Sequence, residues 1–393
     1  MGGARRTPPS PPAVTPGLFV ITGGGTGGHT SPGLAVASVL TSRGHRCAWI
    51  GSYDGIEARR VPAAGIEYVA ISTGKLRRYW DRRNVTDLLI NVPAGVVGAW
   101  RALGRLRPRA VFGTGGFVAL PVVAAAAACG IPAVIHEQTA VPGLANRVSA
   151  PLARRIAVTY ADSAHHFPAA KVAVTGNPVR PELRRGSRAD AFARYGFDPG
   201  VPLVYVTGGA LGANRINRAV GEVLPALLAH AQIVHQCGDN PATGDLAWLR
   251  ERRAALPPDL AARYVVTPFV GAELADLFAA TSLVIGRAGA GTVNECCQLG
   301  LAALYVPLPG TSGDEQTANA RLVERAGGAE LLPQSLLTPA TLAERVAALV
   351  SAPDRLKTMG ERATALAVPD AAERIADLLE ALETTPPSAR GTR

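Results

Sequence analysis

The chain has 393 residues, of which 48% are hydrophobic and 18% are charged, and its formal net charge is +10. This length predicts two domains with sizeable cores, and the positive charge favours anionic partners such as phosphorylated metabolites or an anionic lipid surface. Nucleic acid is the weaker choice because no zinc-finger, helix-turn-helix or RNA-binding pattern accompanies the charge, and five scattered cysteines without a CxxC pair indicate neither a disulfide framework nor a structural metal.

The N-terminal segment 1–16 is rich in proline, arginine and threonine, and it lacks the apolar stretch that a signal peptide carries. We expect this segment to be a disordered arm. The longest apolar stretch, 117–129, contains Pro121 and is shorter than the ~20 residues that a membrane-spanning helix needs. These segments predict a cytoplasmic protein that is either soluble or bound peripherally to a membrane.

Strand-like segments alternate with alanine- and leucine-rich helical segments, a pattern typical of βαβ units and parallel sheets. In the first half, strands are expected at 18–21, 47–50, 68–71, 110–112, 133–135, 155–158 and 171–174. In the second half, they are expected at 203–206, 232–236, 264–267, 283–286, 303–306 and 329–332. Each half opens with a strand and a glycine-rich turn, so the sequence predicts two Rossmann-like α/β domains. The boundary is expected near 176–181, where two prolines interrupt regular structure.

The first glycine-rich turn, 23–30, joins a strand to a helix and contains His29. Such a turn brings backbone N–H groups up to an anionic or polar ligand. Its G-x-G-x-x-G spacing also matches the dinucleotide fingerprint, which leaves a nicotinamide oxidoreductase as an alternative. That fingerprint needs an acid at the end of the second strand, and Asp54 comes later, in an expected loop. The sequence therefore favours a site for a sugar or phosphate.

Two interpretations of His29 remain open. A neutral imidazole at a helix start, kept uncharged by the helix dipole, is suited to act as a general base near pH 7. The alternative is a helix-terminal histidine that makes only a local hydrogen bond.

Apolar and basic residues are interleaved between Lys75 and Arg109. The apolar ones are Leu88, Leu89, Ile90, Val92, Val96, Val97 and Trp100, and the basic ones are Lys75, Arg77, Arg78, Arg82, Arg83, Arg101 and Arg105. An apolar patch rimmed by cations binds an anionic bilayer. The alternative is an amphipathic helix that packs on the core and has a solvated basic face.

Further glycine-rich or polar segments follow the carboxyl ends of expected strands, where α/β proteins bind ligands. In the first half these segments are 113–117 and 136–139. In the second half, small residues in 287–295 allow a diphosphate to approach the backbone at a helix start. Glu295 in that segment either accepts hydrogen bonds from ribose hydroxyls or interacts with the helix dipole. The amide side chains of 307–320 suit sugar hydroxyls, since they both donate and accept.

Together these motifs resemble those of the MurG-type N-acetylglucosaminyltransferase family of peptidoglycan synthesis, from Leu18 to Leu382. The matching segments are 24–29, 115–117, 136–138, 176–180, 208–209, 287–290, Glu295, Gln316 with Asn319, and 369–374. The resemblance implies a GT-B fold, in which two Rossmann-like α/β domains face a central cleft. It implies an N-terminal acceptor and membrane domain at 17–177, a UDP-sugar domain at 178–369, a helix at 370–385 that packs back on the first domain, and a tail at 386–393.

The resemblance also implies an inverting transfer of GlcNAc from UDP-GlcNAc to lipid I, giving lipid II, without metal or cofactor and at the inner face of the cell membrane. His29 is implied as the catalytic base. The implied donor-binding residues are Thr26, Gly27, Arg180, Gly209, Ala210, Val270, Arg287, Ala288, Gly289, Ala290, Glu295, Gln316 and Asn319. The implied acceptor-binding residues are Gly28, Gly115, Gly116, Glu137, Gln138 and Thr139. In the donor set, uracil is expected at the Val270 backbone, ribose at Glu295, phosphate at Arg180 and the 288–290 turn, and sugar hydroxyls at Gln316 and Asn319.

Three departures from the family's usual pattern occur, at four positions. Ala210 and Leu211 replace a Ser-Gln pair, Thr139 replaces an asparagine, and Glu315 replaces a histidine or arginine. These departures leave two other functions open. One is an N-acetylglucosaminyltransferase of specialised metabolism with a small-molecule acceptor, and the other is a non-catalytic, membrane-associated scaffold that binds UDP-sugars.

Overall fold

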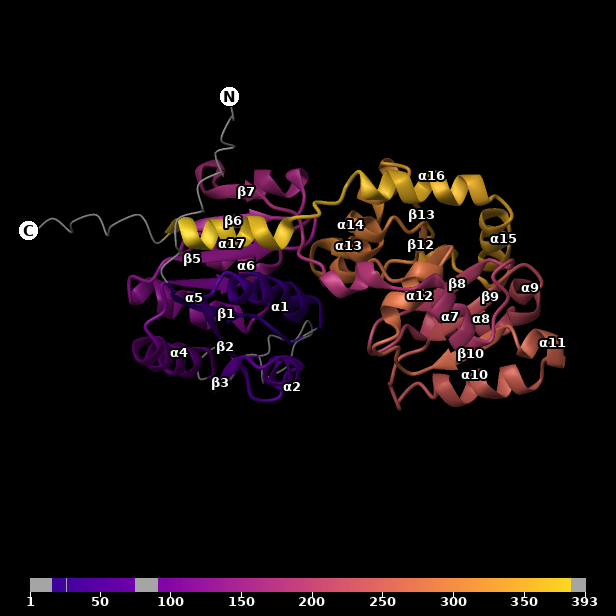
Figure 1. Ribbon diagram of the computed structural model, residues 1–393, viewed down its shortest axis with the longest axis horizontal. Coiled ribbons are helices and arrows are strands. Elements are labelled where there is room, and N and C mark those ends of the chain that lie inside the picture. The colour runs from indigo at the N-terminus through magenta and orange to yellow at the C-terminus, as the bar shows by residue number, and fades with distance from the viewer. Residues whose placement is uncertain (1–15, 26, 75–90, 383–393) are drawn as a thin grey trace, which may run out of the picture.

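The computed structural model describes residues 16–25, 27–74 and 91–382, and it divides them into two α/β domains, each built on one parallel sheet (Figure 1). Outside these residues lie positions 1–15 of the expected arm, the expected tail, positions 75–90 of the interleaved apolar and basic segment, and Thr26. The strands of the first sheet are β1 (Leu18–Thr22), β2 (Arg46–Ser52), β3 (Glu67–Ile71), β4 (Ala110–Gly113), β5 (Ala133–Glu137), β6 (Arg155–Val158) and β7 (Val172–Val174). Those of the second are β8 (Leu203–Thr207), β9 (Gln232–Gln236), β10 (Tyr264–Thr267), β11 (Leu283–Gly286), β12 (Ala303–Tyr305) and β13 (Ala329–Leu331).

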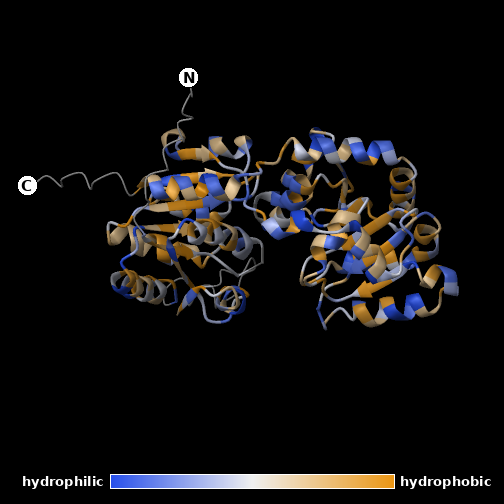
Figure 2. Cartoon of the chain, viewed as in Figure 1, coloured by the Kyte–Doolittle hydropathy of each residue, from blue (hydrophilic) through white to orange (hydrophobic). Residues whose placement is uncertain are grey.

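The strand order is β3-β2-β1-β4-β5-β6-β7 in the first sheet and β10-β9-β8-β11-β12-β13 in the second. In both sheets the order reverses beside the opening strand, β1 or β8, so the glycine-rich turns after these strands lie at a topological switch point. This architecture confirms the prediction of two Rossmann-like domains. The strands are the most hydrophobic parts of both domains (Figure 2), as expected for parallel sheets covered on both faces.

Helices cover both faces of each sheet. In the first domain they are α1 (Gly27–Ser42), α2 (Glu57–Ala63), α4 (Val92–Leu106), α5 (Ala119–Ala128) and α6 (Leu144–Ser149). In the second they are α7 (Arg188–Tyr195), α8 (Asn214–Glu222), α9 (Leu224–Leu228), α10 (Asp245–Ala254), α11 (Pro258–Ala261), α12 (Leu274–Ala280), α13 (Ala290–Leu299), α14 (Glu315–Arg325), α15 (Pro339–Val350) and α16 (Pro353–Thr364). Within the described part of the chain, no helix is long and apolar enough to cross a membrane.

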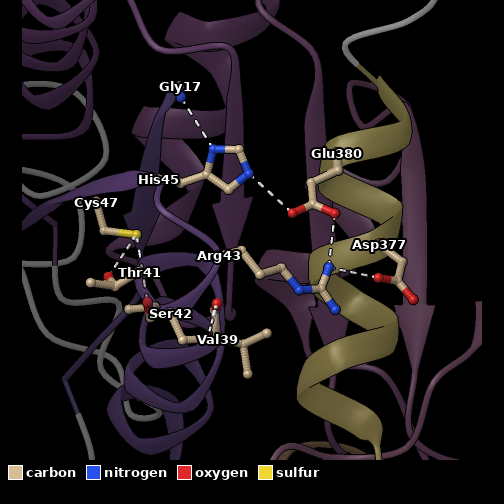
Figure 3. Close-up of polar contacts among 10 residues, drawn as sticks. Gly17, Val39, Thr41, Ser42, Arg43, His45, Cys47, Asp377 and Glu380 are labelled. Atoms are coloured by element: carbon tan, nitrogen blue, oxygen red, sulfur yellow. Dashed lines mark hydrogen bonds and ion pairs between the residues drawn. The ribbon is translucent and has the colours of Figure 1, made fainter. Parts of the chain in front are cut away.

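The last helix, α17 (Ala371–Ala381), follows α16 in the sequence but packs on the first domain (Figure 1). Its buried residues Ile375, Ala376 and Leu379 belong to the same apolar cluster as Phe19 and Trp49 of the first sheet. The polar side of the same interface joins Arg43 and His45, which follow the end of α1, to Asp377 and Glu380 of α17 (Figure 3). The chain therefore crosses between the domains twice, first between β7 and α7 and again between α16 and α17.

The two crossings touch each other. Gly176, in the first, has a φ of +76°, and a Cβ placed there would lie 2.3 Å from Cβ of Val368 in the second. Gln298 of α13 donates hydrogen bonds to the carbonyls of both crossings, Asn177 O at 3.0 Å and Val368 O at 3.2 Å. Glycine at 176 thus serves both the left-handed backbone and the close approach of the two connections.

Candidate active site

His29 lies in the first turn of α1 and is held by the segment that follows β4. Its Nδ1 is 3.0 Å from the Thr114 carbonyl oxygen, and the same carbonyl accepts a hydrogen bond from the Gln138 amide at 2.9 Å. The Gln138 amide nitrogen also lies 3.1 Å from Nδ1, so this nitrogen faces both a carbonyl acceptor and an amide donor. A proton on Nδ1, donated to the Thr114 carbonyl, is the arrangement that leaves the Nε2 lone pair available. Burial lowers the pKa of His29, whereas the Thr114 carbonyl and the carboxylates of Glu137 and Glu57 raise it by a smaller amount. The ring is therefore neutral at pH 7, as a general base must be.

The predicted Gly115-Gly116 turn forms the wall against the His29 ring. Both glycines have left-handed φ angles, +94° and +75°. A Cβ at either position would come within 3.3 Å of the ring, and at Gly116 it would lie 2.8 Å from the Gly24 carbonyl oxygen. Small residues are thus required here for the ring to pack between two backbone segments.

Glu57 of α2 is a functional residue that the sequence reasoning missed. Its carboxylate is fully buried and accepts hydrogen bonds from Gly25 N–H at 3.0 Å and from the Ser52 hydroxyl at 2.6 Å. A Cβ on Gly24 would lie 2.2 Å from this carboxyl group. Glu57 comes shortly after β2, near the position where a dinucleotide fold carries its ribose acid, but here the carboxylate fixes the glycine-rich turn from behind. The only signal in the sequence was an acid two residues after Gly55, at the start of a short helix.

Glu137 was predicted to contact the acceptor, but its carboxylate is bonded within the protein instead. Its side chain is buried and both carboxylate oxygens serve its own loop. One oxygen accepts hydrogen bonds from the Thr139 backbone N–H at 3.0 Å and from the Thr139 hydroxyl at 2.7 Å. The other oxygen accepts hydrogen bonds from Gly143 N–H at 3.1 Å and from Asn146 Nδ2 at 2.9 Å. Together with Gln138, which is likewise buried, Glu137 shapes the segment behind His29 and leaves no carboxylate oxygen for a ligand.

A cleft of about 520 Å³ lies between the two domains. The first domain lines it with Gly28, Ser31 and Pro32 of α1 and Ile56 and Arg60 near and on α2. From the second domain and the linker before it, the predicted donor residues Arg180, Gly209, Ala210, Val270 and Glu295 line it, together with Phe269, Gly291 and Thr292. The side chains of Arg60 and Phe269 were not predicted to take part. The cleft thus gathers five of the thirteen implied donor residues and one implied acceptor residue, Gly28.

Glu295 and Arg180 form an ion pair in the wall of this cleft, with Arg180 Nη2 3.5 Å from Glu295 Oε1. Burial raises the pKa of Glu295, and the two cations Arg180 and Arg60 lower it. Arg180 Nε is buried and has no hydrogen-bond partner among the described residues. The expected uracil position is also occupied within the protein, because Val270 N–H donates to the Gln236 side chain at 3.0 Å.

Arg287 and Asn319 do not face the cleft as predicted. The Arg287 guanidinium donates to the carbonyls of Val306 at 2.9 Å and Pro307 at 3.1 Å, so it holds the loop after β12. Asn319 is fully buried: its Nδ2 donates to Ala288 O at 3.1 Å and its Oδ1 accepts Ala140 N–H, from the first domain, at 3.0 Å. In this arrangement both side chains are occupied by backbone partners rather than by a sugar.

The remaining implied donor residues surround the start of α13 and of α14. Gly289 is the N-cap of α13 and Ala290 its first residue, while Ala288 is fully buried. The Gln316 side chain of α14 accepts Leu308 N–H at 3.0 Å. Three residues of the ten-residue helix α13 line the cleft: Gly291 and Thr292 in its first turn, and Glu295.

Two family models match the chain. They are the glycosyltransferase family 28 N-terminal domain, over residues 19–158, and the glycosyltransferase family 28 C-terminal domain, over residues 203–375. The chain belongs to glycosyltransferase family 28. The first model spans β1 to β6 of the first sheet and the second spans all six strands of the second sheet, and the first crossing lies between the two matched regions.

Curated relatives of this family 28 member carry the name UDP-N-acetylglucosamine–N-acetylmuramyl-(pentapeptide) pyrophosphoryl-undecaprenol N-acetylglucosamine transferase. The one from Lachnoclostridium phytofermentans is 37% identical over 329 residues, which is 84% of this chain and 89% of the relative. The one from Treponema denticola is 36% identical over 385 residues, which is 93% of this chain and 98% of the relative. The resemblance to the MurG-type family is thereby confirmed.

Solved structures agree on the fold. Acinetobacter baumannii MurG superposes with a TM-score of 0.70 at 30% identity, over 93% of this chain and all of that one. A glycosyltransferase of kitacinnamycin superposes with a TM-score of 0.71 at 19% identity, over 94% of this chain, which supports the fold alone. The GT-B architecture and the assignment as a glycosyltransferase therefore hold for this chain.

Proposed function

We propose that the chain transfers N-acetylglucosamine from UDP-GlcNAc to lipid I, undecaprenyl-diphospho-MurNAc-pentapeptide, and so forms lipid II in peptidoglycan synthesis. The observation that carries the proposal is an identity of 36% to 38%, over 84% to 93% of the chain, to enzymes with that activity in their name. The cleft between the domains supports it, because it offers the cations Arg60 and Arg180 to a diphosphate and is lined by Gly28, the residue before the neutral His29.

In this reaction an acceptor hydroxyl attacks the anomeric carbon of the sugar, UDP leaves, and the configuration is inverted. His29 Nε2 accepts the proton of the attacking hydroxyl, since Nδ1 is engaged by Thr114. The leaving diphosphate lies at the N-terminus of α13, where Gly291 and Thr292 enter the cleft. The helix dipole and the Arg180 guanidinium stabilise the negative charge that develops on UDP.

The acceptor is anchored in a bilayer, and helix α4 offers a surface for that contact. Its residues Ala99 and Leu103 are buried in the first domain, whereas Trp100 is 55% and Val97 46% exposed. Arg101 and Arg105 are exposed on the same helix. An exposed tryptophan among cations favours the headgroup region of an anionic membrane. We therefore place this helix against the inner face of the cell membrane.

An acceptor screen with UDP-GlcNAc, in which UDP release is measured, tests the proposal. We expect release with a short-chain lipid I analogue. Release only with small aromatic or aminocyclitol acceptors would overturn it in favour of a specialised-metabolite transferase, the alternative that Ala210 and Leu211 suggest. UDP binding without turnover on any acceptor would instead indicate a scaffold.

A further inference from the structure

Arg60 is the one cation that the first domain contributes to the cleft, among the residues that the structure describes. It is carried by α2, the helix whose first residue, Glu57, fixes the glycine-rich turn. Its side chain is half-buried, whereas that of its neighbour Arg59 is exposed. The position of Arg60 is thus set by the same short helix that fixes the glycine-rich turn before His29.

Arg60 faces a like charge across the cleft. Arg180, in the linker to the second domain, lines the same cleft and pairs with Glu295 at 3.5 Å. Within the described part of the chain, the Arg60 guanidinium makes no hydrogen bond or ion pair, and Arg180 Nε is buried without a partner. Burial lowers the pKa of Arg60, as does the charge of Arg180, while Glu295 raises it. Two guanidinium groups therefore share a single carboxylate, which leaves this region with a net positive charge.

A half-buried pair of cations is unfavourable unless an anion joins it. The guanidinium fork suits phosphate oxygens, with which it forms short, charge-assisted hydrogen bonds. Once Glu295 turns to ribose hydroxyls, as the donor assignment requires, Arg180 loses the one carboxylate partner that it has among the described residues. A diphosphate between Arg180 and Arg60 would then neutralise both.

We propose that Arg60 is a donor-binding residue that holds the diphosphate of the nucleotide sugar from the first domain, opposite Arg180. The proposal rests on the proposed function in taking a nucleoside diphosphate sugar as the ligand. Arg180 belongs to the linker and Glu295 to the second domain, so Arg60 makes donor binding depend on both walls of the cleft.

Calorimetric titration of the full chain with UDP and with uridine tests this assignment. Arg60→Gln should raise the Kd for UDP about tenfold, the size expected for one charge-assisted phosphate contact, and should leave the Kd for uridine unchanged. Arg60→Lys should recover part of the loss, since it keeps the charge but not the fork. Arg59→Gln, on the exposed side of the same helix, is the matched control and should bind UDP as the native chain does.

A second measurement separates binding from folding. Because Arg60 and Arg180 repel each other in the free protein, Arg60→Gln should not lower the Tm without ligand, yet it should reduce the increase in Tm that UDP produces. Equal Kd values for UDP in Arg60→Gln and Arg59→Gln would overturn the assignment. An unchanged Kd for UDP with a raised KM for the lipid-linked acceptor would also overturn it, and would assign Arg60 to the diphosphate of the acceptor. If Arg60→Gln weakens UDP binding but the native chain transfers no GlcNAc, the assignment stands and the proposed function fails.

Discussion

Replacing Glu380 with alanine tests how the C-terminal helix α17 is held on the first domain (Figure 3). The Glu380 carboxylate accepts hydrogen bonds from His45 Nε2 at 3.0 Å and Arg43 Nη1 at 2.8 Å. His45 Nδ1 accepts the Gly17 N–H at 3.1 Å, so the ring must carry a proton on Nε2 and donate it to Glu380. The His45 side chain is fully buried, and alanine at 380 would leave that N–H without an acceptor.

Asp377 provides a matched control on the same helix. It bonds the same Arg43 guanidinium at 2.7 Å, but it is 64% exposed, compared with 22% for Glu380. An exposed ion pair contributes about 0.2–1 kcal/mol. Losing the charged acceptor of a buried donor costs about 1.5–3 kcal/mol. We therefore expect Glu380→Ala to lower the free energy of unfolding by about 2–3 kcal/mol and Asp377→Ala by less than about 1 kcal/mol.

Urea denaturation of both variants, followed by circular dichroism, measures these two costs. A smaller free energy of unfolding at an unchanged denaturant slope would identify a lost contact in the native state. Equal costs for Glu380→Ala and Asp377→Ala would refute the reasoning, because burial would then not distinguish the two carboxylates. So would the absence of any cost for Glu380→Ala.

Three further predictions concern His29 and Asn319. His29→Ala should lower kcat by about 10²–10⁴-fold with an unchanged Kd for UDP, while His166→Ala, on the surface, should leave kcat unchanged. Since burial lowers the pKa of His29 from 6.5, the base stays neutral to lower pH, and the acid limb of kcat/KM should have its midpoint below 6.5; a midpoint above 7 would contradict this role. Asn319→Ala should lower the free energy of unfolding by about 1–3 kcal/mol in urea, because buried partners in both domains lose their hydrogen bonds. An unchanged stability with a raised KM for the donor would instead show that Asn319 contacts the sugar directly.

The strands and their order along the chain were predictable because they depend on local signals. Alternation of apolar runs with helical segments placed a strand at 18–21, and the structure has β1 at Leu18–Thr22. Glycine-rich turns after the opening strands marked the switch points of both sheets. These signals lie within a few residues of the features that they predict.

The directions of site side chains were less predictable because they depend on partners far along the chain. Asn319 is bonded to Ala140, 179 positions earlier, and Arg287 to carbonyls after the next strand. Glu57 was missed because its partners are a backbone N–H and a serine hydroxyl, which no motif records. Arg60 was missed because only the packing of α2 against the cleft distinguishes it from Arg59. The roles implied for Thr26 and for residues 75–90 stay predictions, since they lie outside the described residues.

The central claim is that this cleft transfers a sugar to a lipid-linked acceptor. The most direct test incubates the purified full chain with UDP-GlcNAc and a short-chain lipid I analogue and follows the acceptor by mass spectrometry. The account predicts that the analogue gains one N-acetylhexosamine, that UDP appears in equal amount, and that His29→Ala slows both. An unmodified lipid I analogue, with transfer to a small-molecule acceptor under the same conditions, would contradict it.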